Sequence, residues 1–199
     1  RNVSHSARSG STMTKDEQRS EMRQLLASMS IQELQEGSDT ICKHLASIAS
    51  IATADTLLAY LPLPDEVDIS PLLAKWIVES RTVCVPIVSW EDKTMRAGLL
   101  ASMDDKSIIK GRYGLREPSD PHPVPADTID VMLVPGCGFD VDGGRVGRGA
   151  GYYDRFLATH RAPVVIGVGF DSQVLDSIQR EKHDQLMTAV VTPSGILVN

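Results

Sequence analysis

Short apolar runs that alternate with helix-forming segments constrain the fold of this chain more than any other feature. The runs occupy residues 56–61 (TLLAYL), 82–85, 129–134, 163–168 (PVVIGV) and 190–191. Strands that are apolar without alternation are typical of parallel sheets that are covered on both faces. We therefore expect an α/β fold in a single domain, with a mostly parallel sheet and helices on both faces.

Helix signals fill the segments between these runs. From Lys15 onward, apolar residues recur at i, i+3, i+4 and i+7, starting at Met22. The capping box at residues 30–33 (SIQE) starts a second helix. Ser70 and Pro71 fit the N-cap and first position of a third. A fourth helix is expected to begin near Gly151. The stretch 89–125 is the least regular part of the chain, with a weak strand expected near residues 95–100.

Charge and composition exclude several classes of protein. The 199 residues hold 20 Lys and Arg against 26 Asp and Glu, a net charge of -6, which repels nucleic acid and anionic membranes. The longest uncharged run, residues 185–199, is too short to span a bilayer. Three cysteines without metal-type spacing indicate free thiols. We expect a cytoplasmic monomer, with residues 1–12 as a leader or disordered extension and residues 13–199 as the domain.

The segment 134–157 (VPGCGFDVDGGRVGRGAGYYDRFL) carries the strongest chemical signal. A strand runs into a loop rich in glycine and arginine and then into a helix, which is where open α/β sheets bind ligands. Glycines allow close approach of the backbone, while Arg145, Arg148 and the helix N-terminus favour anions. The pattern predicts a polyphosphate site that is neither a P-loop nor a dinucleotide fingerprint. The alternative is a loop that is bent for packing only.

Two carboxylates and one basic helix face are further candidates. Asp154 follows the loop closely enough to bind a metal that bridges phosphates, and Asp184 precedes the last strand. Alternatively, Asp154 pairs with Arg155 and Asp184 is a turn residue. Three cations recur at intervals of four residues and so share one face of the first helix: Lys15, Arg19 and Arg23. This face is either solvated or lies against an anion.

The segment PGCGFDVDGGRVGRGAGYYDRFL resembles the hallmark of the 5-formyltetrahydrofolate cyclo-ligase family. Other family landmarks occur in the right order: Lys15 and Arg19 before the first helix stripe, LPLPDE at residues 61–66, GRYGLREP at 111–118, and His183-Asp184 before Val190. The similarity covers nearly all of residues 13–192. It implies that ATP and 5-formyltetrahydrofolate become 5,10-methenyltetrahydrofolate, ADP and phosphate through a phosphorylated formyl group, with Mg²⁺.

The resemblance also implies roles for individual residues. ATP would contact Lys15, Arg19, Tyr113, Arg145, Gly147, Arg148, Gly149, Ala150, Gly151, Tyr152 and Tyr153. Folate would contact Arg19, Leu61, Glu66, Arg148 and Tyr152. Lys15, Arg148 and Tyr153 would be catalytic, and Asp154 and Asp184 would hold Mg²⁺.

Two positions depart from the family pattern. Ala150 stands where many members carry lysine, and Thr188 stands where aspartate is frequent. Without that cation, either ATP binding is weaker or Arg148 and Lys15 suffice. The alternative to the cyclo-ligase is a non-catalytic or repurposed paralogue that binds nucleotide or folate without turnover. A kinase with another small acceptor is a third reading, although it would not need Glu66.

Overall fold

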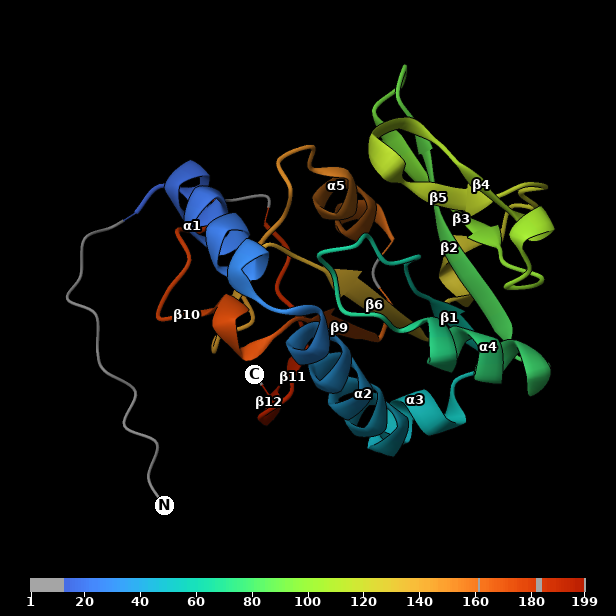
Figure 1. Ribbon diagram of the computed structural model, residues 1–199. Coiled ribbons are helices and arrows are strands. Elements are labelled where there is room, and N and C mark those ends of the chain that lie inside the picture. The colour runs from blue at the N-terminus through green and yellow to red at the C-terminus, as the bar shows by residue number, and fades with distance from the viewer. Residues whose placement is uncertain (1–12, 161, 182–183, 199) are drawn as a thin grey trace.

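A seven-stranded sheet forms the centre of the protein in the computed structural model, which describes residues 13–160, 162–181 and 184–198 (Figure 1). The expected leader at residues 1–12 and the landmark residue His183 lie outside these ranges. The strand order is β12-β11-β9-β6-β1-β2-β3. The strands are β1 Thr56–Leu58, β2 Thr82–Ser89, β3 Thr94–Leu99, β6 Val131–Pro135, β9 Val164–Val168, β11 Ala189–Thr192 and β12 Gly195–Val198.

The sheet is parallel in its interior and antiparallel at both edges. The pairs β1–β2, β1–β6, β6–β9 and β9–β11 are parallel, whereas β3 and β12 are antiparallel to their neighbours. The mostly parallel α/β sheet that the apolar runs predicted is therefore confirmed. The antiparallel strand β12 was not expected. Its residues 195–198 follow β11 after a short turn and pair back on it as a hairpin.

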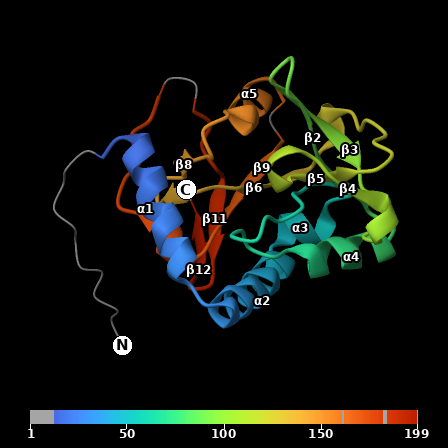
Figure 2. The same cartoon turned by 45° about the horizontal axis from the view of Figure 1, so that its top comes forward.

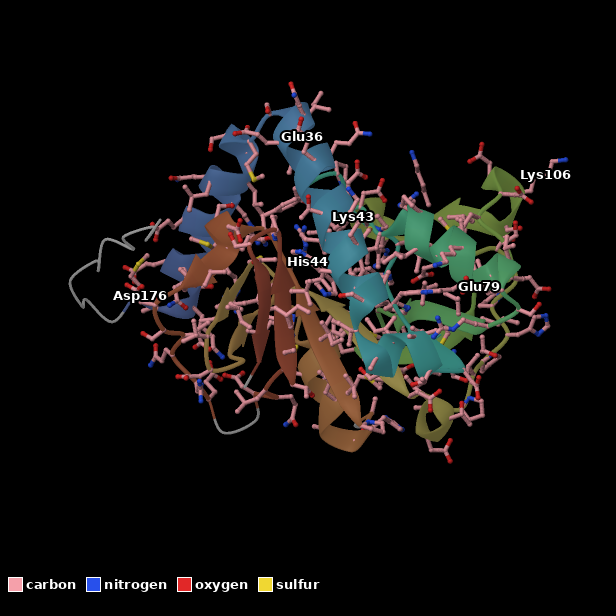
Figure 3. The ribbon with its side chains drawn as sticks, turned by 90° about the horizontal axis from the view of Figure 1, so that it is seen from below. Glu36, Lys43, His44, Glu79, Lys106 and Asp176 are labelled. Atoms are coloured by element: carbon pink, nitrogen blue, oxygen red, sulfur yellow. The ribbon has the colours of Figure 1, made fainter. Side chains whose placement is uncertain are left out.

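Helices cover both faces of the sheet, and the strand residues alternate between them. Leu57 packs into the core with α2, α3 and α4, whereas its neighbour Leu58 packs with Phe156 of α5 on the other face. The α2 residue His44 reaches the sheet, where its Nδ1 lies 3.0 Å from the carbonyl oxygen of Thr192 (Figure 3). The helices are α1 Lys15–Ser28, α2 Ile31–Ser47, α3 Ala49–Thr53, α4 Ser70–Val78 and α5 Tyr152–Thr159.

Local signals explain where the first helices begin. The Thr14 and Ser30 hydroxyls each accept a hydrogen bond from the backbone N–H three residues on, and the Glu17 and Glu33 carboxylates accept one from the backbone N–H of the cap residue. Each capping box satisfies N–H groups that the helix itself leaves unpaired. No helix in the described part of the chain is long and apolar enough to cross a membrane.

The first strand is shorter than its apolar run. Residues 56–61 were expected as one strand, but β1 ends at Leu58, because its pairing with β6 stops there. The chain then leaves the sheet, and Tyr60 and Leu61 line a cavity instead. β2 is longer than expected and pairs with β3 as far as Ser89. Pro86 is tolerated because it lies beyond the end of β1, where the ladder on that side has stopped.

The glycine- and arginine-rich segment is not one loop, as its composition had suggested. It contains the short hairpin of β7 Gly138–Asp140 and β8 Arg145–Val146, to which β10 Val174–Leu175 adds a third strand. The weak strand expected near residues 95–100 is present as β3, and the stretch 89–125 also holds a second hairpin, β4 Ile108–Lys110 with β5 Arg116–Pro118. The free thiols predicted at Cys42, Cys84 and Cys137 are present, and burial raises the pKa of Cys84 to about 12.

Candidate active site

A cavity of about 640 Å³ lies where segments from the carboxyl ends of β1 and β6 meet the β4–β5 hairpin and α5. In Figure 2, α1 lies to one side of α5 and the β4–β5 hairpin to the other. This edge of a parallel sheet is where ligands bind in open α/β folds. The predicted site residues that line the cavity are Leu61, Glu66, Tyr113, Arg145, Gly147, Arg148, Ala150, Gly151, Tyr152, Tyr153 and Asp154.

Aromatic rings form one wall of the cavity. The ring of Trp90 lies 5.3 Å from that of Tyr113 and 5.8 Å from that of Tyr152, between centroids. The Arg155 guanidinium lies 5.1 Å from the centre of the Tyr152 ring. Such flat, polarisable surfaces suit planar heterocycles. Sequence reasoning missed Trp90, because it follows β2 in the stretch that had no clear pattern.

The N-terminus of α5, which begins with Tyr152 of the aromatic wall, forms an adjoining part of the cavity lining. Gly151, the N-cap residue, has a left-handed backbone with φ of 66°, and no side chain caps the helix. Since residues 150–154 line the cavity, the uncapped N–H groups of the first turn lie at its edge. An uncapped helix N-terminus favours an anion. Gly147 is required sterically, because an added Cβ would lie 2.8 Å from an Arg145 nitrogen.

Arg145 is held in place below this wall. Its side chain is only 4% exposed, and its Nη2 donates to Asp154 Oδ1 at 2.9 Å while Nη1 donates to the carbonyl of Pro135 at 3.1 Å. Arg145 Nε has no hydrogen-bond partner among the described residues. Asp154 therefore pairs with Arg145 rather than with Arg155, which instead donates to the carbonyls of Lys93 and Ala150.

Arg148 connects the glycine-rich segment to the loop after β1. Its Nε donates to Glu66 Oε1 at 3.0 Å, and its Nη2 donates to Asp65 Oδ1 at 2.7 Å. The Glu66 side chain is 9% exposed, and burial raises its pKa although Arg148 opposes the shift. Burial also raises the pKa of Tyr153, so the Tyr153 phenol stays protonated at neutral pH. The residues expected at phosphate and at folate therefore touch each other directly.

The cations expected at the start of α1 lie beside the cavity rather than on its wall. Lys15 Nζ is 2.6 Å from Asp184 Oδ2 and 3.4 Å from Glu181 Oε1. Arg19 pairs with Asp16, and its Nε donates to the carbonyl of Gly147 at 2.9 Å. Lys15, Arg19, Gly149 and Asp184 are thus the predicted residues that do not line the cavity. On this helix face it is Arg23 that lines it.

The two carboxylates expected to bind Mg²⁺ have different surroundings. Asp154 lines the cavity and pairs with Arg145, whereas Asp184 contacts Lys15. Within the described ranges, no three His, Cys, Asp or Glu side chains gather as metal ligands would. Mg²⁺ is commonly held by one or two carboxylates together with phosphate oxygens and water. Asp154 fits such a site as a single protein ligand.

Two buried residues of the hairpin fix the position of this segment. Phe139 is fully buried, and a Cβ added to Gly136, Gly167 or Gly169 would lie within 3 Å of its ring. Asp140, 2% exposed, accepts hydrogen bonds from the backbone N–H groups of Gly144 and Ile178. Both residues lie in the quoted motif, but a sequence does not distinguish a supporting carboxylate from a ligand-binding one.

Comparisons with known proteins identify the family. Residues 11–193 match the model of the 5-formyltetrahydrofolate cyclo-ligase family. A 5-formyltetrahydrofolate cyclo-ligase of Mycolicibacterium smegmatis is 37% identical over 152 residues, which cover 72% of this chain and 76% of the relative. The Escherichia coli cyclo-ligase is 26% identical over 182 residues, 88% of this chain and 98% of its own.

Solved structures give the same result. The NMR structure of Aquifex aeolicus 5,10-methenyltetrahydrofolate synthetase superimposes with a TM-score of 0.80 at 25% identity, covering 94% of this chain and 93% of that one. A synthetase from Mycoplasma pneumoniae shares the fold, with a TM-score of 0.73 at 21% identity over 91% and 99% of the two chains. The family match spans the sheet, the cavity and the glycine-rich segment alike. This chain belongs to the 5-formyltetrahydrofolate cyclo-ligase family.

Proposed function

We propose that this chain converts 5-formyltetrahydrofolate and ATP into 5,10-methenyltetrahydrofolate, ADP and phosphate in the cavity described above, with Mg²⁺. One observation carries the proposal: a single cavity joins an anion-binding wall, the uncapped N-terminus of α5 with Arg145 and Arg148, to a wall that suits a flat heterocycle, Glu66 with the aromatic rings. A cytoplasmic location, a monomeric state and the absence of nucleic-acid partners remain predictions.

The proposed reaction needs positioned charge more than a side-chain nucleophile. The formyl oxygen attacks the γ-phosphorus, the bond from that phosphorus to the ADP oxygen breaks, and N10 then attacks the formyl carbon. N10 loses its proton and phosphate leaves as the new ring closes. Phosphoryl transfer depends mainly on alignment and on cations that stabilise the developing charge. Mg²⁺, bound through Asp154 and phosphate oxygens, would supply part of that charge.

The side chains of the cavity have distinct tasks in this proposal. Arg148 exchanges Asp65 and Glu66 for phosphate oxygens, and its pairing with both shows that its guanidinium reaches the cavity. Lys15 likewise exchanges Asp184 for phosphate. The partly buried Tyr153 phenol remains a hydrogen-bond donor, because desolvation raises its pKa. Glu66 accepts hydrogen bonds from the amino-pterin ring, as a carboxylate with several lone pairs can.

Absorbance of the methenyl product in the near ultraviolet tests the proposal. The protein is mixed with 5-formyltetrahydrofolate and Mg²⁺ in the presence and absence of ATP, and ADP is measured in parallel. Growth of the band that requires ATP and matches ADP release one to one is the expected result. Binding of ATP by calorimetry without product would instead favour the nucleotide- or folate-binding paralogue, and attention would then turn to Ala150.

A further inference from the structure

Arg23 is a cation of the cavity wall to which neither the motif nor the proposed reaction assigns a task. It lies on the same face of α1 as Lys15 and Arg19, but it alone of the three lines the cavity. Lys15 is paired with Asp184, and Arg19 is paired with Asp16. No hydrogen bond or ion pair joins Arg23 to any residue within 13–160, 162–181 or 184–198.

The other arginines of the cavity have partners inside the protein. Arg145 pairs with Asp154, Arg148 pairs with Asp65 and Glu66, and Arg116 donates to the carbonyl of Pro62 at 3.0 Å. Arg145 and Arg148 are thus paired with carboxylates, whereas Arg116 contacts a neutral carbonyl oxygen. Arg23 lines the cavity, is exposed to solvent and has neither kind of partner within the described residues, so its charge is available at the mouth of the cavity.

We propose that Arg23 binds an anionic oxygen group of a substrate at the cavity mouth, and that this group is a carboxylate of the glutamate end of the folate. The inference rests on the function proposed above. A guanidinium binds carboxylate or phosphate through two parallel hydrogen bonds, so both chemistries fit the residue itself.

Position favours the carboxylate. Arg23 is eight residues beyond Lys15, which is about 12 Å along the helix axis at 1.5 Å per residue. Among the residues proposed for phosphate, Lys15, Arg19 and the loop around Gly147 lie toward the start of α1, where Arg19 contacts the Gly147 carbonyl. Arg23 is exposed, and a flexible, charged tail leaves a binding site where water is accessible.

Calorimetric binding with three probes tests this assignment: 5-formyltetrahydrofolate, the same compound without its glutamate, and a non-hydrolysable ATP analogue. The variants are Arg23→Gln and Arg23→Lys. The matched control is Lys43→Gln, which removes an exposed cation of α2 that does not line the cavity (Figure 3). Arg23→Gln should lower the affinity for 5-formyltetrahydrofolate about 10-fold, which is the effect expected from losing a hydrogen bond to a charged group. Arg23→Lys should restore part of the loss.

Each other outcome has a definite meaning. Arg23→Gln should not change the binding of the compound without glutamate, the binding of the ATP analogue or the thermal midpoint. Lys43→Gln should not change the binding of any of the three probes. Equal weakening of both folate compounds would overturn the carboxylate contact, and weakening of the ATP analogue alone would assign Arg23 to the triphosphate. If the unaltered protein binds neither folate compound, the proposed function itself fails, and the Arg23 assignment fails with it.

Discussion

The substitution Glu66→Gln distinguishes effects on folate binding from effects on ATP binding, because Glu66 is the proposed folate acceptor and also contacts Arg148. Its Oε1 accepts from Arg148 Nε at 3.0 Å, and its Oε2 accepts from the backbone N–H of Leu63 at 3.0 Å. Glutamine has nearly the same shape but carries no charge, and its amide nitrogen cannot accept a hydrogen bond. The substitution therefore removes the negative charge and one of the two oxygens that could accept from the amino-pterin ring, and it weakens the pair with Arg148, which keeps Asp65.

The expected magnitude follows from the burial of the carboxylate. A hydrogen bond to a charged group contributes about 1.5–3 kcal/mol, so folate affinity should fall by about 10- to 150-fold. ATP affinity should not fall, because Arg148 loses a competing partner. The free energy of unfolding should change by only about 1 kcal/mol, since the lost ion pair is offset by relief from burying a charge.

The pH dependence of stability gives an independent check on Glu66. Burial raises the pKa of Glu66 above its ordinary 4.5 in the folded protein, so the folded state binds the proton more tightly than the unfolded chain. The stability that this carboxyl contributes is present below pH 4.5 and is lost as pH rises through its folded pKa. Glutamine does not titrate, so the stability of Glu66→Gln relative to the original should rise across that window.

Steady-state kinetics with each substrate varied in turn, and urea unfolding at several pH values, measure these effects. The signature is a raised KM for 5-formyltetrahydrofolate with an unaltered KM for ATP. An equal loss for both substrates would show that Glu66 acts through Arg148 and the shape of the cavity rather than on folate. An unaltered KM for folate would refute its role as an acceptor.

Three further substitutions test other parts of the site. Arg148→Ala should lower kcat/KM by about 100-fold or more, and it should also lower the thermal midpoint, because the nearly buried Glu66 carboxylate loses its cation; an unchanged kcat/KM would remove its role. Asp154→Asn leaves a buried guanidinium unpaired and should cost about 2–3 kcal/mol, and it should also raise the Mg²⁺ requirement; unaltered metal dependence would make Asp154 purely structural. Gly167→Ala places a Cβ 2.6 Å from the Phe139 ring, so the free energy of unfolding measured by denaturation should fall by about 1–3 kcal/mol. As a control, Gly111→Ala places its Cβ 3.6 Å from the nearest atom and should be near neutral.

The sheet was predictable from the sequence because its strands are buried on both faces. The run PVVIGV became β9, and residues 129–134 became the core of β6 with a shift of one or two residues. The edge strands were less predictable, since an edge strand needs no continuous apolar run. β12 pairs with β11 alone, and the short strands β7 and β8 follow from glycine-rich sequence that also fits a loop.

The sequence predicted which residues form the site better than it predicted which of them contact each other. The motif named Arg145, Arg148 and Asp154, and the structure places all three on one cavity wall. Which carboxylate faces which cation depends on long-range packing, and no local spacing encodes a contact such as that of Arg148 with Glu66, 82 positions apart. Trp90 was missed for the same reason, because its partners Tyr113 and Tyr152 are distant in sequence.

These contacts would let a chain with a net charge of -6 maintain the polyphosphate site that we propose. Lys15 is paired with Asp184, Arg145 with Asp154, and Arg148 with Glu66, so the cations proposed for phosphate are held in position by carboxylates. The pairing avoids the repulsion that clustered cations would otherwise cause, at the expense of affinity, since phosphate must displace a carboxylate at each pair. The backbone N–H groups at the start of α5 have no such competitor, because no side chain caps that helix. We therefore infer that the backbone determines where the phosphates bind, and that exchange at the arginine and lysine pairs couples their arrival to a rearrangement of the folate wall.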